Sequence, residues 1–196
     1  GEDAQAVAWG DVRTGISGPI VVSVDQDESS GDAGDALAVC SGQQLTHYRG
    51  TIEFLQSNAG SRLVNEVSVD NYLRGVVPKE VSASWGDAGG GAGMNALMAQ
   101  SVAARSYVLA ESRYSYADTC DTQSCQVYGG AAKRSSSSAP AILVERPQTD
   151  SAISQTSGKV RTWSTGANAG QIASTEYSSS NGPNTAGGAF PSVEDL

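Results

Sequence analysis

The chain has 196 residues, which suffices for one domain with a proper hydrophobic core. Its 39% of hydrophobic residues and 23 glycines are typical of a loop-rich globular protein, not of a coiled coil or a disordered polyelectrolyte. A net charge of −9 argues against a nucleic-acid partner, since such a protein needs a basic face. No apolar run approaches the roughly 18 residues of a transmembrane helix.

The first third of the chain, residues 1–69, predicts β-structure. Short apolar runs of branched residues lie at 20–24 and 37–39, and apolar and polar residues alternate over 48–55 and 62–69. Residues 1–4 contain neither a basic nor an apolar leader, so we expect a signal peptide to have been removed.

The pattern changes at residue 70, and 70–130 predicts a helical unit. Asp70 is expected to cap a short helix that Gly75 closes, and Pro78 and Glu80 mark the first turn of a second one. A glycine-rich loop at 86–93 precedes the clearest helix, Met94 to about Arg113. Its apolar stripe contains Met94, Leu97, Met98, Val108 and Leu109.

Three cysteines leave three interpretations open. Cys120 and Cys125 can form a small disulfide loop, supply two thiolates to a zinc ion, or remain as free thiols. The disulfide is favoured over zinc because the single histidine, His47, is distant in the sequence. Cys40 is expected to be reduced and buried.

The last segment, 141–196, is expected to be β-rich with a polar tail. It follows a serine-rich linker at 134–140, and its short strands are expected around Gly158, Gly166 and Gly170. No internal repeat is present. The sequence therefore predicts a single α+β domain over 1–196, with β-rich segments at both ends of a helical unit and an active-site cleft between them.

Glu80 is the candidate proton donor. It follows an apolar run and precedes Trp85, and desolvation there would favour the protonated carboxyl group. A first-turn position opposes this, because the helix dipole favours the anion. Taken alone, the pattern fits a structural glutamate that satisfies backbone N–H groups better than a catalytic one.

Arg105 stands in the middle of the apolar stripe of the long helix. A guanidinium among apolar side chains must find a carboxylate or several carbonyl groups, unless its stem is buried and its head reaches water. Other catalytic patterns are absent: the sequence has no Gly-x-Ser-x-Gly and no phosphate-binding Gly-Lys-Ser/Thr ending.

Three ordered blocks resemble the SpoIID/LytB family of stage II sporulation protein D and amidase-enhancer proteins. The first is VNEVSVDNYLRGVVPKEV from Val64. The second comprises ALMAQSVAARSY from Ala96 and CQVYG from Cys125, and the third is YSSSNG from Tyr177, with Thr185 beyond it. The blocks cover about half of the chain.

The resemblance implies a bacterial lytic transglycosylase that cleaves peptide-denuded peptidoglycan strands and leaves 1,6-anhydromuramyl ends. It implies Glu80 as the catalytic residue and Arg105, Tyr177 and Ser179 as substrate-binding residues. No cofactor is expected. Some members bind zinc, but no histidine lies beside Cys120 and Cys125, so no metal ligand is carried over.

Because several family members are known only as activators, the alternative is a non-catalytic, peptidoglycan-binding enhancer of a cell-wall amidase. A third possibility is a hydrolase that pairs Glu80 with a second carboxylate such as Asp87. All three imply a secreted, cell-wall-associated protein whose partners are glycan strands, with an amidase as a further partner. Arg74, Lys79 and Arg105 are expected to form a basic lip for muramyl carboxylates.

Overall fold

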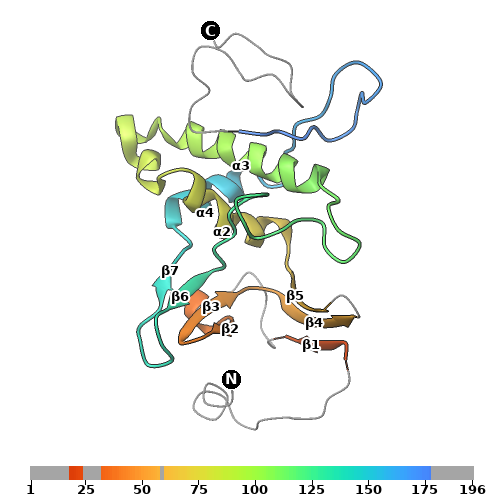
Figure 1. Cartoon of the computed structure of the whole chain (residues 1–196). Coiled ribbons are helices and arrows are strands. Elements are labelled where there is room, and N and C mark those ends of the chain that lie inside the picture. Colours follow the sequence, from red (N-terminus) through yellow and green to blue (C-terminus); the bar gives the residue numbers. More distant parts are fainter. Residues whose placement is uncertain (1–17, 24–31, 58–59, 178–196) are drawn as a thin grey trace.

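The computed structural model describes residues 18–23, 32–57 and 60–177. Figure 1 shows the helices gathered on one side of the molecule and the strands on the other. In chain order the elements are β1 (Ile20–Val22), η1 (Ala33–Asp35), β2 (Leu37–Ser41), β3 (Gln44–Tyr48), β4 (Thr51–Ser57), β5 (Gly60–Glu66), α2 (Val69–Glu80), η2 (Ala83–Gly91), α3 (Met94–Ala110), β6 (Ala132–Arg134), β7 (Ile142–Leu143) and α4 (Pro147–Gln155). The α+β prediction is confirmed.

The strands form two antiparallel sheets. The first has the order β1-β4-β5, and the second has the order β2-β3-β6-β7. The alternation at 48–55 and 62–69 corresponds to the β4–β5 hairpin, in which Phe54 pairs with Leu63. The second sheet joins strands from both sides of the helical unit, because β6 pairs with β3 across more than 80 residues of chain.

The main hydrophobic core lies between the helices. Its fully buried members are Tyr72, Leu73, Val76 and Val77 of α2, Ala104 of α3 and Ile153 of α4. Burying these side chains is the main favourable term that holds the three helices together. None of the helices in the described residues is long and apolar enough to cross a membrane.

The two short helices expected after residue 70 are one continuous helix, α2. Gly75 does not end it; the glycine lies where a Cβ atom would come within 2.5 Å of Tyr128 Cε2 and 2.8 Å of the Gly130 carbonyl oxygen. Gly75 O also accepts a hydrogen bond from Gly129 N at 3.0 Å. Pro78 lies inside the last turn of α2, where it has no N–H to donate to the carbonyl group four residues earlier.

Helix α3 begins at Met94 as predicted and ends at Ala110, three residues earlier than expected. Its buried face differs from the predicted stripe: Leu109 is exposed, whereas Ser101 and Ala104 are fully buried. Ser101 fits there because its hydroxyl donates to Leu97 O at 2.8 Å. A stripe chosen by hydrophobicity alone misses such small and internally bonded residues.

The prediction of short strands throughout 141–180 is wrong in part. Strand β7 and an isolated bridge between Thr162 and Ile172 are extended, but the intervening Pro147–Gln155 forms α4. Proline at the first helical position and Asp150 in the first turn are ordinary helix-start signals. The serine-rich 134–140 segment connects β6 and β7, which pair as an antiparallel hairpin.

A buried ion network joins the sheets to the helices. Arg49, between β3 and β4, donates to Glu145 at 2.7 Å, and both side chains are almost fully buried. Arg74 of α2 contacts the same carboxylate at 2.8 Å and Asp150 of α4 at 3.2 Å. These ion pairs link the strand side of the molecule to α2 and α4.

Candidate functional site

A polar cavity of about 500 Å³ opens on the helical side of the molecule. It lies between the C-terminal end of α2, the end of α3, the cysteine loop and residues 176–177. The described residues that line it are Glu80, Tyr107, Arg113, Gln123, Ser124, Cys125, Gln126, Val127, Glu176 and Tyr177. The cavity therefore unites two sequence-predicted site residues, Glu80 and Tyr177, that are almost 100 positions apart.

Glu80 is the last residue of α2 and not part of a first turn as the sequence predicted. The helix dipole at this end favours cations, so the predicted stabilisation of the anion does not apply. The side chain is exposed, and Trp85 is 52% exposed, so the expected desolvation is not present either. Within the described part of the chain, the Glu80 carboxyl group has neither a hydrogen bond nor an ion pair, which leaves it accessible to a ligand.

Tyr177 is fixed beside Glu80 by Gln126. The Gln126 side chain is buried; its Nε2 donates to Tyr177 Oη at 2.8 Å and to Ala104 O at 3.3 Å, while its Oε1 accepts from Tyr72 Oη at 3.3 Å. The Nε2 atom faces two acceptors and the Oε1 atom faces a donor, so the three bonds require the same orientation of the amide. The position of the tyrosine hydroxyl group is thereby defined.

Burial raises the pKa of Tyr177 to about 12, against the effect of the hydrogen bond from Gln126. The negative charge of Glu80 raises that pKa further. Tyr177 is therefore a neutral phenol at any physiological pH, and its hydroxyl group can donate a hydrogen bond into the cavity.

The cavity holds a second carboxyl group, Glu176, which is exposed and adjacent to Tyr177 in the sequence. Asp87, the second carboxylate considered from the sequence, lies in η2, outside the described lining of the cavity, and accepts a hydrogen bond from Gln148 at 2.9 Å. Among the described residues, Glu80 and Glu176 are therefore the pair that could serve a reaction requiring two carboxylates in this cavity.

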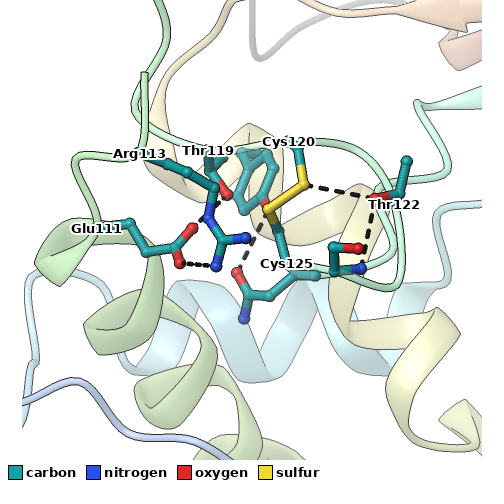
Figure 2. The surroundings of a disulfide bond; sticks show 9 residues. Glu111, Arg113, Thr119, Cys120, Thr122 and Cys125 are labelled. Carbon is teal, nitrogen blue, oxygen red and sulfur yellow. Dashed lines mark hydrogen bonds and ion pairs between the residues drawn. A yellow bond between two sulfur atoms is a disulfide. The ribbon is translucent and has the colours of Figure 1, made fainter. Parts of the chain in front are cut away.

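Cys120 and Cys125 form a disulfide bond, with an S–S distance of 2.03 Å (Figure 2). Cys125 lines the cavity, and the loop that the disulfide closes contributes Gln123 and Ser124 to the same wall. No group of three or more histidine, cysteine, aspartate or glutamate residues in the described ranges is arranged to hold a metal ion. Cys40, on β2, is a free and partly buried thiol.

Arg113 lies beside this disulfide in Figure 2, where its guanidinium faces Glu111. Its Nη2 donates to Glu111 Oε1 at 3.0 Å, and Thr119 donates to the other carboxylate oxygen, Glu111 Oε2, at 2.8 Å. Arg113 is the only cationic residue among the described residues that line the cavity.

Arg105, in contrast, does not line the cavity. Its side chain is almost fully buried and pairs with Asp70 at 2.9 Å. The guanidinium also donates to three carbonyl groups in and just after the last turn of α4, those of Ile153, Thr156 and Lys159. The sequence left two interpretations of Arg105 open, a buried charge with polar partners or a side chain whose head reaches water. The structure shows the buried charge, which a carboxylate and several carbonyl groups satisfy.

The predicted basic lip is not assembled. Arg74 is occupied by Glu145 and Asp150, and Arg105 by Asp70, so that Lys79 alone of the three is exposed. The predicted contact Ser179 lies outside the described residues. Several lining residues had no assigned role in the sequence. Among them, Gln126 belongs to the CQVYG block, whereas no local pattern gave a signal for Arg113 and Glu176.

The geometry defines an α+β protein whose helical side carries an open, polar cavity. Its described lining includes two carboxyl groups, one arginine, and a tyrosine whose hydroxyl group accepts a hydrogen bond from the buried Gln126 amide. Residues 57–163 match the family SpoIID, stage II sporulation protein, and the chain belongs to this family. The matched range includes Glu80, Arg113, Gln126 and both disulfide cysteines, whereas Glu176 and Tyr177 lie beyond it.

Two relatives are similar over part of their length. An amidase enhancer of Bacillus subtilis is 36% identical over 110 residues, which cover 56% of this chain and 12% of the relative. An uncharacterized protein of Brachyspira hyodysenteriae is 36% identical over 90 residues, which cover 44% of this chain and 23% of that protein. The match thus spans less than a quarter of either relative, and no solved structure matches the chain.

Proposed function

We propose that the protein is a peptidoglycan lytic transglycosylase that cleaves peptide-free glycan strands with Glu80 as its catalytic residue. The observation that carries the proposal is the position of the Glu80 carboxyl group: it is exposed, unpaired within the described residues, and faces a polar cavity beside a fixed tyrosine hydroxyl. Membership of the SpoIID family and the similarity to an amidase enhancer support a role at the cell wall.

One carboxyl group suffices for this reaction. In its protonated form Glu80 donates the proton to the glycosidic oxygen as the bond from the muramyl C1 breaks. The resulting carboxylate then accepts the proton of the muramyl C6 hydroxyl while that oxygen bonds to C1. The products are a free 4-hydroxyl group on one strand and a 1,6-anhydromuramyl end on the other, and Glu80 is again protonated.

In this scheme Tyr177 and Gln126 position the sugar. The Gln126 amide N–H donates to the Tyr177 hydroxyl oxygen. The Tyr177 O–H must therefore point elsewhere and is available to donate to a sugar oxygen. Because the pKa of Tyr177 is about 12, this donor persists over the whole pH range in which a wall enzyme works. Ser179 remains a proposed contact from the same block.

Two other functions use the same cavity. A non-catalytic enhancer of a cell-wall amidase is favoured by the name of the Bacillus subtilis relative. A hydrolase is favoured by the presence of Glu176 in the cavity, since a second carboxylate can activate a water molecule. Each function places the protein outside the cytoplasmic membrane, in contact with the wall.

The test is a digest of purified peptide-free glycan strands, with the products identified by mass spectrometry. We compare the wild type with Glu80→Gln, with Glu176→Gln and with the control Glu66→Gln, an exposed glutamate on β5 outside the cavity lining. The proposal expects anhydro ends from the wild type and the control, and a loss of at least a hundred-fold in rate for Glu80→Gln. Folding should be unaffected, because the Glu80 side chain makes no hydrogen bond or ion pair in the described residues.

Reducing ends from the wild type, lost in Glu176→Gln, would instead establish the hydrolase. If the wild type bound the strands without cleaving them but increased the rate of an added amidase, and Glu80→Gln did the same, the enhancer function would replace the enzyme.

A further inference from the structure

The charges around the cavity are unevenly distributed. Glu80 and Glu176 are both exposed to it, and the protein as a whole carries a net charge of −9. An anionic group on a ligand is repelled by such surroundings unless a cation faces it. Among the described lining residues, Arg113 alone can serve as that cation.

The turn that carries Arg113 is built to hold it in place. Arg113 N donates to Asp118 O at 3.0 Å, and Tyr114 N donates to Ala117 O at 3.1 Å, which closes the turn over 113–118. On this turn the rings of Tyr114 and Tyr116 are stacked, with centroids 5.3 Å apart. The guanidinium is further oriented by Glu111, whose carboxylate is held in turn by Thr119 (Figure 2).

The guanidinium retains donors for a ligand. A guanidinium group has five N–H donors, and the ion pair with Glu111 uses Nη2. The Arg113 side chain is 36% exposed, so a second acceptor can reach it from the cavity. The same protein shows an arginine shared between two carboxylates, since Arg74 contacts both Glu145 and Asp150.

We propose that Arg113 binds the lactyl carboxylate of a muramyl residue and so selects glycan strands from which the stem peptide has been removed. The inference rests on the proposed function, because it names the part of the strand that Arg113 reads. In a peptide-bearing strand the lactyl carboxyl group is an uncharged amide, whereas removal of the peptide leaves a carboxylate. A guanidinium binds a carboxylate through charge-assisted hydrogen bonds that an amide oxygen does not replace.

The experiment measures binding in the Glu80→Gln background, which prevents turnover. Two probes are used: peptide-free strands, and the same strands with their lactyl carboxylates converted to primary amides. We expect the carboxylate strands to bind roughly ten-fold more tightly than the amide strands. Adding Arg113→Gln should remove that preference by weakening only the binding of the carboxylate strands, and Arg113→Lys should restore part of it.

Arg161→Gln is the matched control, because it removes the same charge from an exposed arginine outside the described cavity lining. It should keep the preference, and the melting temperature of Arg113→Gln should equal that of its parent. Equal binding of both strands by the parent, or an unchanged preference in Arg113→Gln, would overturn the role of Arg113 and leave the proposed function intact. If the parent bound neither strand, the proposed function would be wrong, and this inference with it.

Discussion

At the scale of single residues, buried polar groups in this protein are oriented by several partners at once. Gln126 is fixed by Tyr72, Ala104 and Tyr177, and this fixes the tyrosine hydroxyl beside Glu80. His47 is an equally determined group in the second sheet. Its Nδ1 donates to Ala36 O at 3.0 Å, and its Nε2 accepts from Arg134 Nε at 3.2 Å, so the arrangement requires the neutral imidazole.

The surroundings of His47 predict a pH-dependent stability. Burial lowers the pKa of His47 below 6.5; the hydrogen bond to Ala36 and the charge of Asp35 oppose this, and the charge of Arg134 adds to it. The unfolded chain therefore binds a proton on His47 at a higher pH than the folded protein does. As the pH falls below about 6.5, the free energy of unfolding should decrease.

Urea unfolding between pH 5 and pH 7.5 measures this contribution, with His47→Gln as the comparison. The decrease toward acidic pH should be smaller in the variant, which has no titrating group at this position. A wild-type stability that rose toward pH 5, or a variant with the same slope as the wild type, would contradict the assignment.

At the scale of the secondary-structure elements, Arg105 is the link between three helices. It lies on α3, pairs with Asp70 in the first turn of α2, and donates to carbonyl groups in and just after the last turn of α4. A residue at this position controls the relative placement of the helices and thus of Glu80 at the far end of α2. This makes Arg105 a positioning residue in our proposal.

Arg105→Leu should lower the free energy of unfolding by about 3 kcal/mol, because the substitution leaves buried carbonyl groups without their donor. Chemical denaturation measures the change. Normal stability combined with lost glycan binding would instead indicate that Arg105 contacts the substrate, as the family resemblance implies. Arg161→Leu, at an exposed position, is the control and should change stability by less than about 0.5 kcal/mol.

Gly75 of α2 packs against Tyr128, which follows the cysteine loop. The sign of the stability change in Gly75→Ala shows whether helix propensity or this packing dominates at position 75. Helix propensity alone predicts that Gly75→Ala stabilises the protein by about 1 kcal/mol. The added Cβ would lie 2.5 Å from Tyr128 Cε2, so we expect a destabilisation of about 2 kcal/mol instead. A raised melting temperature in Gly75→Ala would show that Tyr128 moves away without loss.

At the scale of the whole molecule, the strands and the helices are joined by the network of Arg49, Arg74, Glu145 and Asp150. Glu145 contacts both arginines with 6% of its side chain exposed. The four groups come from three separate parts of the chain, and their charges balance only when all of them meet.

Glu145→Gln should therefore lower the free energy of unfolding by about 3 kcal/mol, because the buried Arg49 and the partly buried Arg74 lose their shared carboxylate. Denaturant unfolding followed by far-ultraviolet circular dichroism measures the loss, and Glu66→Gln on the exposed side of β5 is the matched control. Equal stability of the two variants would show that the network does not contribute to the packing of the strands against the helices.

The local sequence determined what depends on neighbouring residues. Alternation predicted the β4–β5 hairpin, the apolar period predicted α3, and the short spacing of Cys120 and Cys125 favoured the disulfide that the structure contains. The family blocks singled out Glu80 and Tyr177, which the structure brings to one cavity.

Tertiary structure decided the features that depend on distant partners. From the sequence, Gly75 was predicted to end a helix, whereas in the structure it makes room for Tyr128. Arg105 was predicted to be a cleft residue, whereas in the structure Asp70 and carbonyl groups in and after α4 surround it. Arg113 and Glu176 acquire importance only because the fold places them in the cavity with Glu80. The physical reason is that burial and charge pairing are set by the space around a side chain, and residues far apart in the sequence fill that space.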